Sequence, residues 1–174
     1  MVFAMLAIAS VLSACSPKFD WRDYRSPDGQ FTALFPGKPS RLTRDVDLDG
    51  TKVSLTMTAS QAEDSTFAIG NALMPTQAQA EAALPAMKAA LLNNIQGSVH
   101  SEKSVSAASS TPGGTQQQSS LSIEATGTRE GKPTLLIARF IAQDKRIFQV
   151  VIVGDEKKLS HETIDTFMDS VKLE

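Results

Sequence analysis

The chain is 174 residues long, a length typical of one domain and short for two. It carries 17 Lys and Arg against 19 Asp and Glu, which argues against a dedicated nucleic-acid-binding protein because such proteins carry a basic excess. Hydrophobic residues make up 41% of the chain and exclude a disordered polypeptide. The single cysteine excludes an internal disulfide and a cysteine-based zinc cluster.

Residues 1–14 form an uncharged apolar run that ends in small residues. As a helix this run would span about 21 Å, short of the ~30 Å hydrocarbon core of a bilayer, so it predicts a secretory signal peptide and not a membrane-spanning helix. No Lys or Arg precedes the run, although signal peptides normally begin with positive charge. Either the signal is weak or, as we favour, the true translation start lies upstream of Met1.

The sequence Leu-Ser-Ala-Cys at 12–15 resembles the lipobox of bacterial lipoproteins, and Cys15 is the only cysteine in the chain. In that family the cysteine thiol receives a diacylglyceryl group, and a peptidase then cuts immediately before the cysteine. The resemblance implies that residues 1–14 are removed, that Cys15 is lipidated and that residues 15–20 tether the following domain to a membrane. The alternative is a chance cysteine after an ordinary signal peptide.

The residue after the lipidated cysteine bears on location in the lipoprotein family. In bacteria with two membranes, Asp at this position favours retention at the inner membrane. Ser16 therefore implies the outer membrane, with the domain facing the periplasm of the cell envelope.

Turn signals divide the first half of the mature chain into short strands. Asp49-Gly50 is the strongest hairpin signal, and the alternation of apolar and polar residues through 53–59 is typical of a strand with one buried face. Residues 61–65 are polar and are predicted to connect two strands. The expected strands are 21–25, 31–35, 41–48, 52–59 and 66–74.

One long helix is predicted after these strands. Thr76 and Gln79 have the spacing of a capping box, and Gly97 fits just past the helix end. Pro85 lies inside the pattern and should kink the helix or split it. An apolar stripe recurs at helical spacing through Ala80, Leu84, Met87, Leu91 and Ile95.

The second half contains more strands and a final helix. A strand is expected near 99–106, and residues 107–119, rich in Ser, Ala, Gly and Gln, are predicted to form a mobile loop. Ser160 is predicted to cap the last helix. The remaining expected strands include 121–125, which precedes the turn Glu130-Gly131, and the almost continuously apolar 134–143 and 146–153, which meet at Asp144-Lys145. The buried stripe of the last helix comprises Ile164, Phe167, Met168 and Val171.

The order of strands, helix, strands and helix, with short hairpins throughout, predicts one antiparallel α+β domain over residues 21–174. The segment 21–39, with Trp21, Tyr24 and the run RSPDGQFTALFPGKP, resembles the opening of PsbP-like lipoproteins and secreted proteins. The two apolar strands around 139–148 and the helix that ends near 170–173 are similar as well. The resemblance implies an α/β/α sandwich like that of the photosystem II PsbP protein and the Ran-binding Mog protein. It implies no particular binding or catalytic residue.

Neither histidine completes a catalytic or metal-binding pattern. His161 has a carboxylate beside it in Glu162, but adjacent helical residues point about 100° apart. We therefore expect His161 and His100 to be surface residues. The acidic residues Asp45, Asp47 and Asp49 alternate along a strand and could suggest calcium, but a charged strand face is favoured because no loop Glu closes the site.

Other chemical motifs are missing from the sequence. No Gly-x-Ser-x-Gly elbow and no phosphate-binding loop are present.

Trp21 and Tyr24 could form an exposed contact surface, although packing on the sheet is favoured. Basic residues gather only in pairs, at Arg41/Arg44, Lys145/Arg146 and Lys157/Lys158.

These observations favour a non-enzymatic accessory or binding module, held at a membrane by the lipid on Cys15. Its partner is expected to be a protein or another component of the bacterial envelope, with no nucleic acid, cofactor or metal involved. Two alternatives remain open. One is an envelope hydrolase that uses two carboxylates converging in a cleft, and the other is a carrier of a small ligand, with a gap between helix and sheet opened at Pro85.

Overall fold

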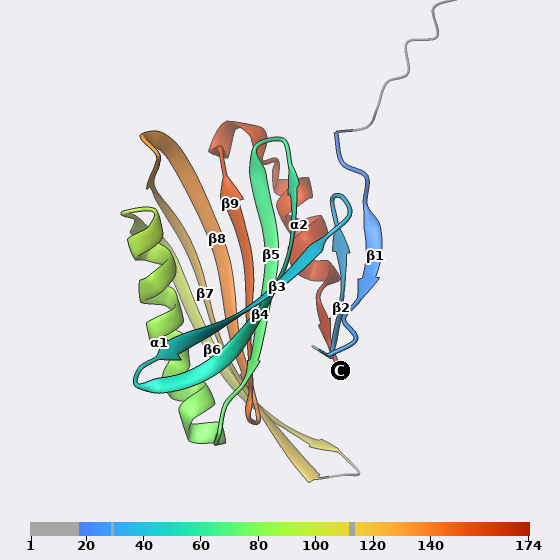
Figure 1. Cartoon of the computed structure of the whole chain (residues 1–174), viewed down its shortest axis with the longest axis vertical. Helices are drawn as coiled ribbons and strands as arrows, with labels where there is room; N and C mark the ends of the chain where they lie inside the picture. Colours follow the sequence, from blue (N-terminus) through green and yellow to red (C-terminus); the bar gives the residue numbers. More distant parts are fainter. Residues whose placement is uncertain (1–17, 29, 112–113) are drawn as a thin grey trace, which may run out of the picture.

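The computed structural model describes residues 18–28, 30–111 and 114–174. Its main element is a seven-stranded antiparallel sheet in the order β3-β4-β5-β9-β8-β7-β6 (Figure 1). The strands are β3 (Ser40–Leu48), β4 (Thr51–Ala62), β5 (Ser65–Leu73), β6 (Ser98–Thr111), β7 (Gly114–Arg129), β8 (Lys132–Gln143) and β9 (Arg146–Gly154). The predicted antiparallel α+β class is therefore confirmed.

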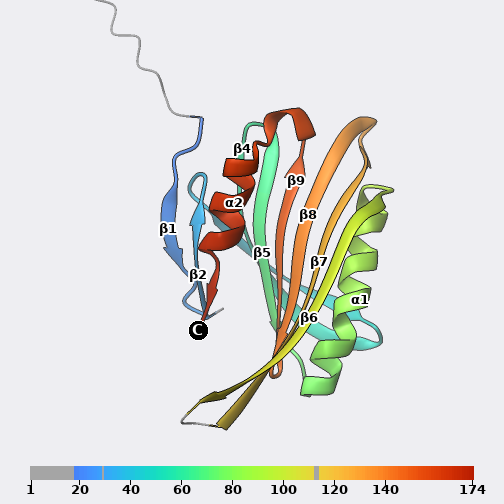
Figure 2. The same ribbon diagram turned by 180° about the vertical axis from the view of Figure 1, so that it is seen from behind.

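A smaller sheet and two helices complete the fold. The small sheet has the order β1-β2-β10, from β1 (Arg22–Arg25), β2 (Phe31–Phe35) and β10 (Lys172–Leu173). The helices are α1 (Gln77–Asn94) and α2 (His161–Ser170), and a short 3-10 turn, η1 (Glu156–Lys158), precedes α2. Helix α1 lies on one face of the large sheet, whereas α2 and the small sheet lie on the other (Figures 1 and 2).

Each face of the large sheet has its own hydrophobic cluster. Under α1, buried residues such as Leu84 and Met87 pack on Leu136, Phe140 and Val151 of the central strands. On the other face, α2 and β2 pack aromatic side chains against β5 and β9. The main members of this second cluster are Phe31, Phe35, Phe67, Ile69, Phe148, Val150, Ile152 and Phe167.

Local signals predicted several boundaries correctly. Asp49 and Gly50 both have positive φ, as a tight hairpin turn between β3 and β4 requires. The Thr76 hydroxyl accepts a hydrogen bond from the Gln79 amide at the start of α1. The Ser160 hydroxyl accepts one in the same way from Thr163 at the start of α2.

The predicted mobile loop at 107–119 is wrong. These residues form the outer part of a long hairpin in which β6 and β7 stay paired from Ser98 opposite Thr126 to Thr111 opposite Gly114. The composition, rich in Ser, Ala, Gly and Gln, suggested a loop because it shows no hydrophobic alternation. The ladder of backbone hydrogen bonds holds the two strands together without that signal.

Three smaller predictions also need correction. The segment 61–65 is mostly strand, because β4 runs to Ala62 and β5 starts at Ser65, with only a two-residue turn between them. Helix α1 is not split, and Pro85 sits on its exposed face, where the carbonyl left without an amide partner can bond to water. The segment 15–20, predicted as a tether, overlaps the folded domain, because Phe19 packs on Trp21 and Phe67.

Candidate ligand-binding hollow

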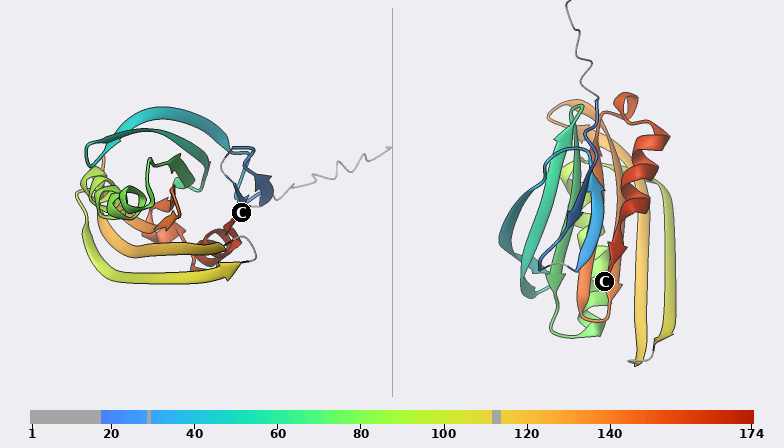
Figure 3. Two further views of the ribbon diagram at one scale, coloured as in Figure 1. Left: turned by 90° about the horizontal axis from the view of Figure 1, so that it is seen from below. Right: turned by 90° about the vertical axis from the view of Figure 1, so that its right-hand side faces the viewer.

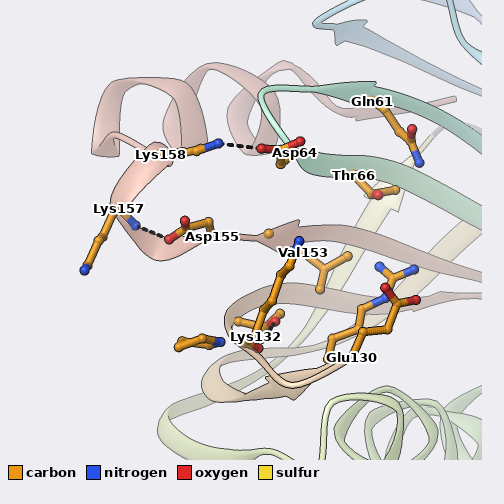
Figure 4. A pocket seen from close by; sticks show the side chains of 13 residues that line it. Gln61, Asp64, Thr66, Glu130, Lys132, Val153, Asp155, Lys157 and Lys158 are labelled. Carbon is orange, nitrogen blue, oxygen red and sulfur yellow. Dashed lines mark hydrogen bonds and ion pairs between the residues drawn. The ribbon is translucent and has the colours of Figure 1, made fainter.

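A hollow of about 600 Å³ opens at one end of the large sheet (Figure 4). Three connections meet there: the β4–β5 turn, the β7–β8 turn and the passage from β9 into η1. Its lining comprises Gln61, Asp64, Thr66, Arg129, Glu130, Lys132, Pro133, Thr134, Val153, Gly154, Asp155, Lys157 and Lys158. The rim is therefore charged, and the sheet strands supply the floor.

A slot of about 360 Å³, lined by aliphatic side chains together with Asn94 and Arg129, lies between the last turn of α1 and the sheet. Arg129 and Val153 line both spaces, so the slot opens off the hollow. The slot is lined by Leu91, Asn94, Ile95, Arg129, Leu136, Val151 and Val153. Together the two spaces offer an apolar recess with a charged mouth.

Helix α1 ends close to the sheet because two glycines allow it. A Cβ added at Gly127 would lie 2.2 Å from the backbone oxygen of Ile95, so no larger residue fits there. Thr128 donates its amide to the same oxygen at 2.6 Å. A Cβ added at Gly97 would lie 2.7 Å from the Ile95 side chain, so a larger residue would crowd it there as well. These contacts fix the wall of the slot.

Two cations face each other at the mouth of the slot. Arg129 ends β7 and Lys132 begins β8, and they are direct cross-strand partners in the ladder. Like charges in this position repel and destabilise a sheet by a few tenths of a kcal/mol, up to about 1 kcal/mol. Among the described residues, neither side chain has an ion-pair partner. The pair therefore presents two cations without a direct ion pair among the described residues, and Lys132 acts on the Asp64 carboxylate only at longer range.

The acidic groups of the hollow are mostly engaged with the protein itself. Asp64 forms an ion pair with Lys158, and the hydrogen bond from Lys158 lowers the pKa of the Asp64 carboxyl (Figure 4). The same contact raises the pKa of the Lys158 ammonium. Asp155 accepts a hydrogen bond from the Lys157 amide at 3.0 Å and thereby caps η1. Among the acids of this lining, that leaves Glu130, in the β7–β8 turn, without a side-chain hydrogen bond or ion pair to the described residues.

A hydrolase would need two carboxylates of different proton affinity in one cleft. Three acids do line the hollow, but Asp64 stays ionised beside Lys158 and so is a poor proton donor. Asp155 is committed to the η1 cap. The arrangement suits binding better than acid–base chemistry.

The other candidate residues lie apart from this hollow. His100 bonds to Thr126 at a bulge in β6, and His161 is exposed in the first turn of α2, so both are surface residues as predicted. Asp45 accepts from Ser54 and Asp47 from the Gly50 amide, as expected for a charged strand and turn. Within the described residues, no group of His, Cys, Asp and Glu could hold a metal ion.

Trp21 and Tyr24 pack on the domain, as favoured from the sequence. Trp21 meets Phe67 edge-on with ring centroids 6.3 Å apart. Tyr24 meets Phe35 in the same way at 5.6 Å. These contacts fix the start of the domain against β5 and β2.

The predicted lipidation site lies outside the described residues, as do the signal segment 1–14 and Ser16. Within the described part of the chain, no helix is long and apolar enough to cross a membrane. Neither a protein-family model nor a curated protein matches the sequence.

Sequence reasoning missed Arg129 and Lys132. The signal that could have identified them is the turn Glu130-Gly131 with a cation on each side, since such a turn places its flanking residues opposite each other. Lys157 and Lys158 were noticed only as a basic pair. Their meeting with Asp64 brings together residues far apart in the chain, which spacing cannot show.

Proposed function

We propose that this chain is a PsbP-like binding module, held at a membrane of the bacterial envelope through a lipid on Cys15, which binds a small ligand in the hollow and its slot. The PsbP-like assignment is supported by the antiparallel sheet with one helix on each face and by the motif from Trp21 to Pro39. Lipidation is supported by the lipobox at 12–15, and the outer membrane is supported by Ser16.

The observation that carries the binding proposal is the unpaired Arg129–Lys132 couple at the mouth of an apolar slot. A ligand that joins an apolar segment to an acidic group would satisfy both features. Its apolar part would displace water from Leu91, Ile95 and the sheet, and its acid would relieve the repulsion between the two cations.

The attachment point supports this arrangement. Phe19 and Trp21 pack on Phe67, which lies near the start of β5, next to the β4–β5 turn that lines the hollow. The chain therefore enters the domain at the same end as the hollow (Figure 3). Cys15 is three residues before Lys18, a reach of about 10 Å, so the lipid would hold this end of the domain close to the bilayer.

The binding proposal is tested with a matched pair of short amphiphiles, hexanoate and hexylamine, in thermal unfolding of the detergent-purified full-length chain. At about ten times its Kd, hexanoate should raise Tm by roughly 3–5 °C, whereas hexylamine should not. The double variant Arg129→Gln/Lys132→Gln should lose the response to hexanoate.

The control variant Arg44→Gln/Lys145→Gln removes the same charge from other turns and edges, and it should respond as the wild type does. Equal shifts with both amphiphiles, or an unchanged response in the Arg129→Gln/Lys132→Gln variant, would contradict the proposed site.

The lipid anchor is tested separately by cell fractionation. Cys15→Ser should move the protein from the membrane fraction to the soluble fraction, because acyl chains contribute about 0.8 kcal/mol per buried CH₂. Lys18→Ser is a control that leaves the cysteine intact. Unchanged fractionation of the Cys15→Ser variant would contradict lipid anchoring without bearing on the hollow.

A further inference from the structure

The two edges of the large sheet are protected very differently. The edge strand β3 carries Arg41, Arg44, Asp45 and Asp47 within nine residues. Charges on an edge are a common device against pairing with another strand. The opposite edge, β6, has no charged residue at all from Ser104 to Thr111.

The β6 edge is also long and open. It has 14 residues and, within the described part of the chain, pairs on one side only, with β7, so its outer row of backbone donors and acceptors has no ladder partner there. Side chains 98–108 of β6 are all exposed, and most are Ser or Ala, too small to block an approaching strand. Two aliphatic side chains are exposed on this strand, Val105 at 46% and Val99 at 37%.

The few charges of β6 lie to one side of this segment. Glu102 is held by Lys88 of α1, whose ammonium lies 3.0 Å from the carboxylate. Lys103 is next to it in the chain. From Ser104 onward the edge presents hydroxyl, methyl and backbone groups only, as far as its described side chains reach at Ala108.

We propose that β6 pairs antiparallel with β6 of a second copy of this chain, so that one continuous sheet runs through both. A two-fold axis normal to the sheet keeps each side chain on its own face. Residues that pair across this axis therefore differ by an even number of positions in the sequence. The residue on the axis pairs with the same residue of the second copy. Centring the axis on Glu102 or Lys103 would place like charges directly opposite each other.

The register that fits the side chains is centred on Val105. It buries the exposed Val105 against Val105 of the second copy. It also places Ser104 opposite Ser106, Lys103 opposite Ala107 and Glu102 opposite Ala108. No like charges then face each other, and two partly exposed aliphatic groups leave water together.

A second copy fits this edge better than an unrelated strand does, because the edge complements itself and the fold leaves room beside it. Strand β8 stops at Gln143, opposite Gln118, while β6 and β7 continue to Thr111 and Gly114. The hairpin therefore projects past the rest of the sheet (Figures 1 and 2). From Ala107 outward, β7 is therefore the only strand beside β6 among the described residues.

Sedimentation of the full-length chain in detergent tests the interface. The wild type should shift from monomer to dimer as its concentration rises, and Val105→Lys should stay monomeric because it sets two ammonium groups face to face. The control Leu42→Lys makes the same change at a 53% exposed position on the β3 edge, and it should dimerise as the wild type does. Circular dichroism checks that each variant is folded.

Disulfide capture tests the register. In a Cys15→Ser background the chain has no other thiol, and Val105→Cys should form an intermolecular disulfide under mild oxidation. Directly opposed residues in an antiparallel pair have Cα atoms about 4.5–5.5 Å apart, within disulfide range. The control Ala107→Cys should not cross-link, because this register separates its two copies by about 14 Å along the strands.

The outcomes are decisive in each direction. Concentration-dependent dimers that Val105→Lys abolishes, with capture at position 105 and not at 107, support the proposal. A wild type that stays monomeric at all concentrations overturns it and leaves the edge to a strand of another protein. Capture at 107 in preference to 105, or equal loss of dimers in Leu42→Lys, overturns it as well. The test does not depend on lipidation or on the hollow.

Discussion

The two faces of the large sheet are covered in different ways. On the α2 face, aromatic rings from the small sheet, β5 and α2 pack in T-shaped, edge-to-face contacts. The centroid of the Phe167 ring lies 5.4 Å from that of Phe67 and 5.5 Å from that of Phe35. On the α1 face, the helix contributes mostly alanine, leucine and methionine side chains, and it ends at Asn94, with Ile95 as its cap, before the sheet does (Figure 1). The first face is closed, whereas the second leaves a slot and a charged hollow.

This difference indicates that one face mainly stabilises the fold and that the other is available for ligand binding. The aromatic face has its large side chains fully buried, so it acts as a scaffold that tolerates little change. The open end of the α1 face carries exposed cations and a partly covered apolar floor, which contribute little to folding. Changes at the two faces should therefore separate stability from ligand binding.

The largest expected effect is on the aromatic face. Phe167→Ala removes a ring with no exposed surface and should lower the free energy of unfolding by about 3–5 kcal/mol. Leu91→Ala, at the half-buried slot, should cost clearly less because its cavity already opens to water. Urea denaturation measures both. Equal costs would show that the two faces do not differ as described.

A second, smaller effect concerns the wall of the slot. Gly127→Ala would place a methyl group against the Ile95 backbone oxygen and should cost about 1–3 kcal/mol, since neither backbone can yield easily. Gly37→Ala is the matched control, because its nearest contact is at 3.8 Å. Denaturation of both variants decides this prediction, and a Gly127→Ala variant as stable as the control would contradict the close approach.

The next effect has the opposite sign. Arg129→Gln/Lys132→Gln removes a like-charged cross-strand pair and should stabilise the free protein by a few tenths of a kcal/mol, up to about 1 kcal/mol. The gain should shrink as salt screens the repulsion in the wild type. Thermal unfolding at low and high salt measures it. A loss of stability at low salt would mean that the two cations are compensated after all.

The smallest effect is the pH dependence of the Asp64–Lys158 pair. Because folding lowers the pKa of Asp64, its carboxylate stabilises the folded state at pH values above the ordinary pKa of 3.8. This stabilisation is lost as the pH falls through the lower folded-state pKa. Because folding raises the pKa of Lys158, its ammonium stabilises the folded state at pH values below the ordinary pKa of 10.5. This stabilisation is lost as the pH rises through the folded-state pKa.

The Tm of Asp64→Asn should thus lie slightly below that of the wild type near neutral pH, and the gap should close in strong acid and strong base. Glu63→Gln removes a neighbouring acid that acts on Lys158 only at longer range, so it should show a much smaller gap and a much weaker closure. A gap that stays constant over the whole pH range would show that the pair contributes nothing.

Capping and turn residues predicted many element boundaries correctly. Prediction failed where a strand has a loop-like composition and forms only because it pairs with another strand. The caps at Thr76 and Ser160 and the turn at Asp49 were predictable because each depends on neighbours in the chain. The β6–β7 extension was not, because Ser-rich and Gln-rich strands carry no hydrophobic alternation and form only by pairing with each other.

The candidate site was even less predictable. The hollow depends on where α1 stops relative to the sheet and on three turns that meet from distant parts of the chain. The closeness of Gly127 to Ile95 sets that stopping point, and no sequence spacing reveals it.

Hydrogen exchange with and without hexanoate tests the central claim most directly, because it locates the ligand on one face of the sheet. Bound hexanoate should slow amide exchange around the last turn of α1 and the β7–β8 turn, at residues 91–97 and 127–136. Exchange in β2 and α2 should change little by comparison. Slowing centred on β2 and α2, or no slowing at the open end of the α1 face, would contradict the account.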